Sequence, residues 1–260
     1  MNALTIKLKT LKKTKRKALV FFITAGYPNL NKTYETAVEL HRAGADIIEI
    51  GVPFSDPIAD GPVIQASSDH AIKKGINLTA AFNLARKIKD KTGIPIVLMT
   101  YLNPLLRNGL DETIVRAAKN GVDGFIIPDM PIEECAHFGK ICRNNKLSLV
   151  QMAAPNTEKN RMRAIGKMSD SFVYIVSLTG VTGQRKGLPE FLNRFLRTTK
   201  TEIKRPRFLG FGISNKEQIA KIKKQVDGVI VGSALIKLMK SDKKVIYTFA
   251  SSLRQELDRK

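Results

Sequence analysis

The sequence contains no tryptophan, only two cysteines and only three histidines in 260 residues. Cys135 and Cys142 stand two turns apart in a segment of helical pattern, too far apart for a disulfide, which favours a reduced, cytoplasmic setting. His41, His70 and His137 lack the spacing of a metal-binding motif, so we expect no bound metal.

Membrane and secretory segments are lacking as well. No apolar run approaches the roughly 20 residues that a membrane span requires, and the N-terminal residues lack the apolar stretch and cleavage site of a secretory signal. Hydrophobic residues still make up 43% of the chain, enough for a sizeable core. We therefore expect a globular protein with no membrane association.

Acidic residues are scarce, with 23 Asp+Glu against 44 Lys+Arg and a net charge of +21. This excess makes nucleic acid an alternative partner. However, no aromatic residues interleave with the basic ones, and no nucleic-acid-binding motif is present. We therefore interpret the charge as a solvated surface that also favours anionic ligands, and expect no nucleic-acid binding.

The densest basic run covers residues 7–17 and holds seven basic side chains. Leu4, Leu8 and Leu11 in the same region share one helical face. The pattern predicts an amphipathic first helix with a solvated basic side.

The rest of the chain alternates between short apolar runs and segments of helical periodicity. Eight runs have the composition of strands buried on both faces, at residues 18–26, 47–51, 95–101, 124–129, 148–155, 172–177, 207–212 and 228–233. Helical spacing is clearest at residues 31–43, 78–92, 111–120 and 216–225. Eight similar units predict a closed (β/α)₈ TIM barrel with an N-terminal capping helix, and an open doubly wound sheet is the alternative. Because no linker is evident, we expect residues 1–260 to form one domain.

Residues 47–65 carry the most informative motif. An apolar strand places Glu49 near its end, and a loop with three prolines follows with Asp56 and Asp60. Burying a carboxylate in an apolar strand is costly, and a second acid on a stiff loop suggests a pair with divided acid–base roles. In a barrel these acids converge at the carboxyl ends of the strands, where catalytic residues lie. On spacing alone, a solvated strand end remains the alternative.

Glycine-rich segments lie after the sixth predicted strand, at residues 180–183, and at the ends of the seventh and eighth, at residues 210–212 and 232–233. Barrels often bind phosphate at this place on backbone N–H groups, which glycine allows to approach closely. Tight turns alone would explain one such segment better than three, so we predict a phosphate site. The polar segment 180–187 is interpreted as a mobile lid or, alternatively, as a loop with no closing role.

These segments together resemble the tryptophan synthase alpha chain family over nearly the whole chain. The matching segments are residues 22–28, 49–65, 99–104, 128–134, 180–183, 210–214 and 231–234. The resemblance implies a lyase of tryptophan biosynthesis, which cleaves indole-3-glycerol phosphate to indole and glyceraldehyde 3-phosphate by a retro-aldol reaction.

The resemblance also implies roles for single residues. Glu49 would transfer protons, and Asp60, as an anion, would accept the indole N–H hydrogen bond and stabilise a cationic intermediate. The apolar strand should raise the pKa of Glu49. The implied substrate-binding residues are Phe22, Ile64, Met99, Tyr101, Ile126, Tyr174 and Phe211 around the indole, Thr182 on the lid, and Gly183, Gly212, Gly232 and Ser233 around the phosphate.

A partner is implied too. The resemblance predicts an αββα heterotetramer with a beta chain that holds pyridoxal phosphate and receives indole through a tunnel, whereas this chain needs no cofactor. Residues 53–62 and those after Asn103-Pro104 would face the beta chain.

The sequence departs from the family at a few positions. Leu178 follows Ser177 where an Arg is common, so lid closure and coupling to the beta chain are expected to be weaker, and Pro128 stands where a small residue is frequent. An autonomous indole-3-glycerol phosphate lyase and a catalytically weak activator of the beta chain remain alternatives.

Overall fold

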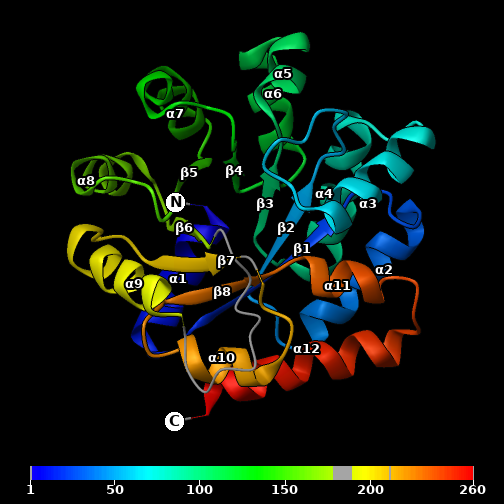
Figure 1. Cartoon of the computed structure of the whole chain (residues 1–260). Helices are drawn as coiled ribbons and strands as arrows, with labels where there is room; N and C mark the ends of the chain where they lie inside the picture. The colour runs from blue at the N-terminus through cyan, green and yellow to red at the C-terminus, as the bar shows by residue number, and fades with distance from the viewer. Residues whose placement is uncertain (1, 178–188, 211, 260) are drawn as a thin grey trace.

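Parallel strands form the centre of the molecule. The computed structural model describes residues 2–177, 189–210 and 212–259, and in these ranges eight strands close into a barrel in chain order (Figure 1). The strands are β1 (Ala18–Thr24), β2 (Ile47–Gly51), β3 (Ile96–Met99), β4 (Gly124–Ile126), β5 (Ser148–Ala153), β6 (Val173–Val176), β7 (Arg207–Gly210) and β8 (Gly228–Val231). β1 pairs with both β2 and β8, which confirms the closed (β/α)₈ barrel and makes the open sheet wrong.

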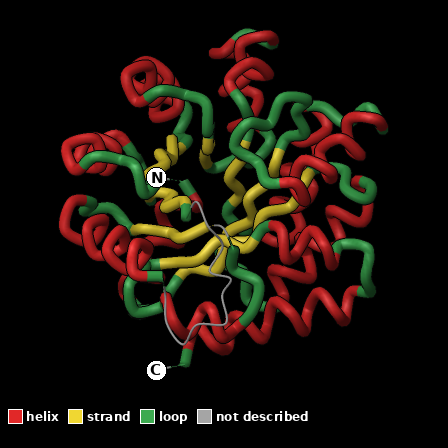
Figure 2. Tube along the Cα trace, viewed as in Figure 1, coloured by secondary structure: helices red, strands yellow, loops and turns green. Residues whose placement is uncertain are grey.

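Helices surround the barrel (Figure 2). They are α1 (Ala3–Lys13), α2 (Leu30–Arg42), α3 (Pro62–Lys73), α4 (Leu78–Thr92), α5 (Leu102–Arg107), α6 (Leu110–Lys119), η1 (Ile132–Glu134), α7 (Cys135–Asn144), α8 (Lys159–Met168), α9 (Glu190–Glu202), α10 (Lys216–Ile222), α11 (Ser233–Leu238) and α12 (Lys243–Asp258). Asparagine side chains cap four of them, at Asn2, Asn29, Asn77 and Asn215. None of the described helices combines the length and apolar character needed to cross a membrane.

Most predicted strands extend beyond the observed ones at their carboxyl ends. For example, Tyr101 and Asp129 lie after β3 and β4 rather than within them. The apolar pattern continues beyond the end of β3 because residues such as Tyr101 are buried without belonging to the strand. The residues that were predicted as strand but lie beyond the observed strands therefore belong to the segments that form the site described below.

The amino ends of the strands share one local device. Gly44 and Gly121 end helices with φ of 96° and 77°, a region that favours glycine. Two residues later, Asp46 accepts a hydrogen bond from Leu19 N (3.0 Å) and Asp123 accepts one from Ile96 N (2.9 Å). The repeated Gly-x-Asp pattern thus has a structural role, since it ties each strand to the preceding one.

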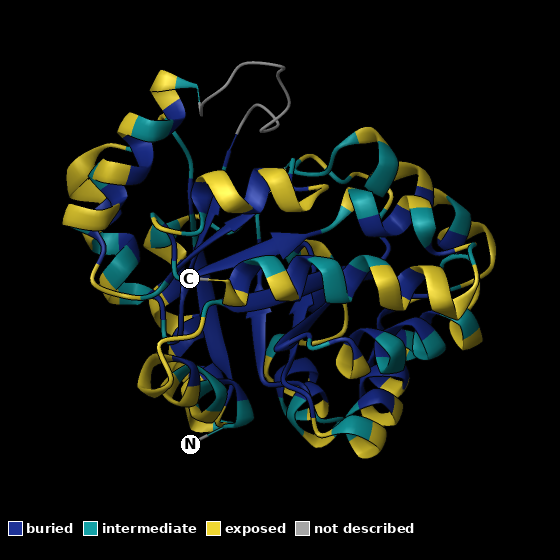
Figure 3. Cartoon of the chain, turned by 90° about the horizontal axis from the view of Figure 1, so that it is seen from below, coloured by how far each residue is buried: buried dark blue, intermediate teal, exposed yellow. Residues whose placement is uncertain are grey.

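Helix α1 lies across the amino-terminal end of the barrel. Asn2 Nδ2 donates to the carbonyls of Asp123 (2.7 Å) and Lys146 (2.9 Å), while Leu4 and Leu11 are buried. Figure 3 has the N-terminus at the lower edge of the molecule, below the buried strands. The predicted amphipathic capping helix is confirmed.

Candidate active site

Glu49 occupies the interior of the barrel. It lies on β2 in register with Phe22 of β1 and Val97 of β3, and only 1% of its surface is exposed. Among the described residues, neither carboxylate oxygen has a hydrogen-bond partner. Burial, followed by the nearby charge of Asp60, raises the pKa of Glu49 to about 8. The side chain is therefore mostly protonated at neutral pH and can donate a proton.

Asp60 lies in the loop between β2 and α3. Burial raises the pKa of Asp60 to about 6, and a hydrogen bond from Tyr101 opposes that rise. Asp60 is therefore mostly ionised at neutral pH, while Glu49 is mostly neutral. Two carboxyl groups with separated pKa values are the usual basis for divided acid–base roles.

Tyr101 holds the Asp60 loop in place. Its hydroxyl accepts a hydrogen bond from Ala59 N (3.0 Å) and donates one to the Asp60 carboxylate. Its ring stacks on the ring of Phe54, with the two centroids 5.0 Å apart. Burial and the charge of Asp60 raise the pKa of this phenol, so it stays a neutral donor. Tyr101 was predicted as a substrate-binding residue; the structure adds a contact to a candidate catalytic acid, which spacing along the chain does not reveal.

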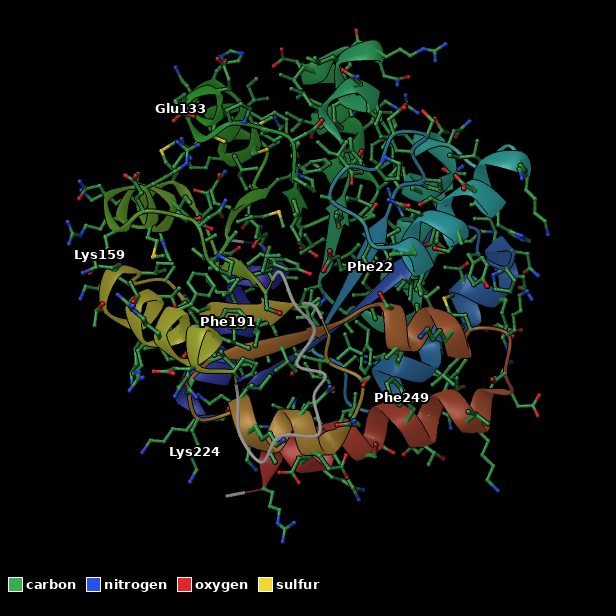
Figure 4. All side chains as sticks on the ribbon, viewed as in Figure 1. Phe22, Glu133, Lys159, Phe191, Lys224 and Phe249 are labelled. Atoms are coloured by element: carbon green, nitrogen blue, oxygen red, sulfur yellow. The ribbon has the colours of Figure 1, made fainter. Side chains whose placement is uncertain are left out.

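Apolar side chains line the barrel mouth next to the two acids. Phe22, Met99, Ile126 and Tyr174 are buried on four different strands, and Ile64 on α3 is half-buried. Figure 4 shows Phe22 over the central strands. Charges of both acids contribute to raising the pKa of Tyr174, after burial, so this ring lies near the pair. The wall suits a flat apolar group such as an aromatic ring.

Gly51 and Gly210, which the sequence analysis included in motifs without a role of their own, leave space for this wall. A Cβ atom at Gly51 would collide with the Phe22 ring, and one at Gly210 would collide with the Tyr174 side chain. Small residues beside large rings along neighbouring strands are the signal from which they could have been found.

Three predicted phosphate-binding residues lie at the carboxyl ends of β7 and β8. Gly212 has φ of 76°, and Gly232 caps α11, whose first residue is Ser233. A Cβ at Gly232 would lie 3.5 Å from Phe22 and 3.7 Å from Ile64, so these turns adjoin the apolar wall. Thr182, Gly183, Phe211 and Leu178 fall outside the described residues.

Asp56 does not join Glu49 and Asp60, contrary to the expectation that three acids converge. It is exposed, and its carboxylate accepts a hydrogen bond from Ser55 Oγ (2.5 Å). The middle of the loop faces solvent, since Ser55, Asp56 and Ile58 are exposed, whereas Val52 at its start is buried and Asp60 near its end is half-buried. No cluster of three metal-ligating side chains occurs in the part of the chain that the structure describes.

Comparison with known proteins agrees with this geometry. The family model described as tryptophan synthase alpha chain matches residues 8–258. The chain belongs to the tryptophan synthase alpha chain family.

Individual relatives cover nearly the full length. The chain is 42% identical over 236 residues to the tryptophan synthase alpha chain of Alkaliphilus metalliredigens, covering 91% of this chain and 88% of the relative. The crystal structure of tryptophan synthase subunit alpha from Legionella pneumophila aligns with a TM-score of 0.89 at 32% identity, covering 99% of both chains. The structure of tryptophan synthase from M. tuberculosis in its aminoacrylate-bound form aligns with a TM-score of 0.88 at 27% identity, covering 99% of this chain and 100% of the M. tuberculosis chain. As a member of the tryptophan synthase alpha chain family, the chain is an enzyme, a lyase of tryptophan biosynthesis.

Proposed function

We propose that the barrel mouth cleaves indole-3-glycerol phosphate to indole and glyceraldehyde 3-phosphate, with Glu49 and Asp60 as its catalytic residues. The observation that carries this proposal is the pair of carboxyl groups with pKa values near 8 and 6 beside an apolar wall. Such a pair holds one proton ready to donate and one negative charge ready to stabilise a cation.

The proposed reaction needs one proton carrier. Protonated Glu49 gives its proton to C3 of the indole, which leaves a cationic ring nitrogen. Asp60 accepts the hydrogen bond of that N–H and stabilises the charge. The Glu49 carboxylate then takes the proton from the side-chain hydroxyl next to the ring, the carbon–carbon bond breaks, and indole and an aldehyde result. Glu49 ends protonated, so the cycle is balanced without any cofactor in this chain.

Binding is divided between two surfaces. The wall of Phe22, Ile64, Met99, Ile126 and Tyr174 would hold the indole. The backbone of Gly212, Gly232 and Ser233 would hold the phosphate, and Gly183, Thr182 and Phe211 complete the proposed set from sequence resemblance. Gly232 adjoins both Phe22 and Ile64, which supports one substrate spanning the two surfaces.

A beta chain that carries pyridoxal phosphate is the proposed partner, in an αββα assembly. Exposed apolar side chains on the catalytic face support this: Ile58 is 81% exposed on the loop after β2, and Leu106 is 53% exposed at the end of α5. Such residues mark interaction sites when they lie together on one face. Because this chain carries a net charge of +21, an acidic partner surface is expected, and association should weaken as salt rises.

Two further points accompany this proposal. The closure of all eight strands in one barrel supports a single domain over residues 1–260.

Buried free thiols at Cys135 and Cys142 fit a reducing compartment, so we place the enzyme in the cytoplasm.

The proposal is tested by indole release from indole-3-glycerol phosphate. The wild-type chain should release indole alone and faster with a beta chain, and the stimulation should fall at high salt. Asp60→Asn should lower kcat by roughly 10²-fold with little change in KM, because the charge acts mainly after protonation. Absence of indole release with or without the beta chain would overturn the proposed reaction, and a loss confined to KM would remove Asp60 from its role.

A further inference from the structure

A cavity lies at the opposite end of the barrel from the two acids. Its volume is about 690 Å³, within the size of small-molecule sites. It is lined by α1, by the end of α9 and the turn after it, and by residues at the amino ends of β1, β6, β7 and β8. In Figure 1, α1 lies behind the strands, on the far side from the viewer. Nothing in the proposed reaction uses this end of the barrel.

The lining is strongly basic. Nine Lys and Arg side chains line the cavity against two acids, Asp170 and Asp227. Arg16 pairs with Asp258, and Arg207 pairs with Asp227. The other seven, four lysines of residues 9–17 and three basic residues of 200–205, make no ion pair within the described ranges. Two segments that are almost 190 residues apart in sequence thus bring unpaired positive charge to one concave surface, which concentrates anions.

The floor of the cavity holds two buried donors. Arg207 is 7% exposed and Ser171 is 5% exposed. Arg207 Nη2 lies 3.3 Å from Asp227 Oδ2, but Arg207 Nη1 and Ser171 Oγ have no hydrogen-bond partner among the described residues. A buried donor left without an acceptor costs free energy. Two such donors in the wall of one basic cavity therefore point to a ligand that brings its own acceptor oxygens.

The lining of the cavity is also partly apolar. Leu8, Leu11 and Ile203 line the cavity together with Pro206. A bare inorganic anion would leave these surfaces without a partner, whereas an organic group would cover them. The lining thus combines acceptor-seeking donors, an apolar wall and exposed cations.

We propose that this cavity binds a small organic polyphosphate of nucleotide size. Arg207 and Ser171 hold one phosphate group at the floor, the apolar wall contacts the organic group, and the lysines of the rim bind the remaining phosphate charge. Single-stranded RNA is the competing ligand, but the only aromatic side chain among the lining residues is the buried Phe208, so the site offers no exposed ring on which bases could stack.

The test is calorimetric titration of the full chain with ATP and with tripolyphosphate, at low and at high salt. ATP should bind once per chain, more tightly than tripolyphosphate because of the apolar wall, and more weakly at high salt. Saturating glyceraldehyde 3-phosphate should leave ATP binding unchanged, since it would occupy the other end of the barrel. Displacement of ATP by glyceraldehyde 3-phosphate, or no binding of ATP at low salt, would overturn the proposal.

A matched pair of double variants separates a site from diffuse attraction. Lys12 and Lys204 line the cavity, whereas Lys13 of the same helix and Lys140 of α7 are exposed outside it. K12Q/K204Q should weaken ATP binding at least about tenfold, and K13Q/K140Q, with the same change in net charge, less than about twofold. Equal losses in both variants would refute a defined site.

Ser171→Ala tests the floor without endangering the fold. It removes an oxygen that has no partner in the described structure, so the melting temperature should stay the same or rise. ATP affinity should fall about threefold to tenfold. An unchanged affinity for ATP would show that Ser171 is not part of the site. If a single-stranded RNA oligomer bound more tightly than ATP, and K12Q/K204Q abolished that binding, the ligand would be nucleic acid and the proposal would be wrong.

Discussion

The two ends of the barrel treat buried carboxylates in opposite ways. At the amino end, Asp46 is 4% exposed and its Oδ2 accepts hydrogen bonds from Leu19 N and from Arg254 Nη1, both at 3.0 Å. Asp123 is similarly bonded to Ile96 N and Lys89 Nζ. At the carboxyl end, Glu49 is equally buried but has no hydrogen-bond partner in the described residues.

This difference distinguishes carboxylates that stabilise the fold from a carboxylate that is available to carry a proton. A carboxylate that is surrounded by donors joins elements of the fold together, as Asp46 and Asp123 do. A carboxylate without donors binds a proton more strongly, which is why the pKa of Glu49 rises to about 8. Burial alone therefore does not raise the proton affinity of a carboxylate; burial without hydrogen-bond donors does, as at Glu49.

Glu49→Gln is expected to have the largest effect on the reaction. The amide keeps the shape but cannot carry a proton, so kcat should fall roughly 10²–10⁴-fold. Single-turnover indole release measures the loss, and a near wild-type rate would exclude Glu49 as the proton carrier.

The same variant has a distinctive effect on stability. Because the pKa of Glu49 is raised from 4.5 to about 8 on folding, the wild type loses stability as pH rises through this window. Glu49→Gln should lack that loss and be more stable than the wild type at pH 8, as measured by denaturant unfolding at several pH values. A variant less stable than the wild type at pH 8 would contradict the raised pKa.

Asp46→Ala should instead act on stability. It leaves Arg254 buried with one carboxylate partner fewer, which should cost roughly 3 kcal/mol of unfolding free energy while kcat of the folded enzyme is kept. Glu133→Ala is the control, since Glu133 pairs with Arg161 at the exposed surface and its loss should leave the free energy of unfolding nearly unchanged. A large drop in kcat without loss of stability in Asp46→Ala would erase the contrast between the two ends.

Gly212→Val tests the phosphate-binding turn. Gly212 has φ of 76°, where a β-branched residue is strained, and its side chain would obstruct the approach of the phosphate. We expect KM to rise about tenfold, as for loss of one or two hydrogen bonds to a charged group. Gly93→Val supplies a matched control, since Gly93 has φ of 66° and nothing within 4 Å of a new Cβ. Equal KM changes in both variants would attribute the effect to backbone strain.

Tyr101→Phe should have the smallest effect, on the pH profile. In the wild type, kcat/KM should fall below pH about 6 as Asp60 is protonated and above pH about 8 as Glu49 ionises. Loss of the phenol removes a hydrogen bond that lowers the pKa of Asp60, so the acid limb should move to higher pH. Tyr247→Phe, at an exposed tyrosine on α12, should leave the profile unchanged. An acid limb that does not move would show that Tyr101 does not act on Asp60.

Much of this molecule was predictable from local pattern. Short apolar runs predicted all eight strands, and the leucines of residues 4–11 predicted α1. Glu49 and Asp60 were recognised because a carboxylate in an apolar strand is costly to bury and a second acid on a proline-rich loop is held in a fixed place. The ends of strands were predicted less well, because residues such as Tyr101 continue the apolar pattern after the strand hydrogen bonds stop.

Contacts between distant segments were not predictable. The outward turn of Asp56, the bond from Tyr101 to Asp60, and the space that Gly51 and Gly210 leave for the rings of Phe22 and Tyr174 follow only from closure of the barrel.

The sequence by itself determined the alternation of strands and helices, the family, and the two acids beside an apolar pattern, because each depends on residues close together in the chain. The tertiary structure alone decided which buried carboxylates find donors, and hence that the pKa of Glu49, which finds none among the described residues, is raised. It also decided that the basic residues of 9–17 and 200–205 share one cavity with Arg207 and Ser171. The physical reason is that solvation and pairing of a charge depend on everything within a few ångströms, and barrel closure brings those atoms from all parts of the chain.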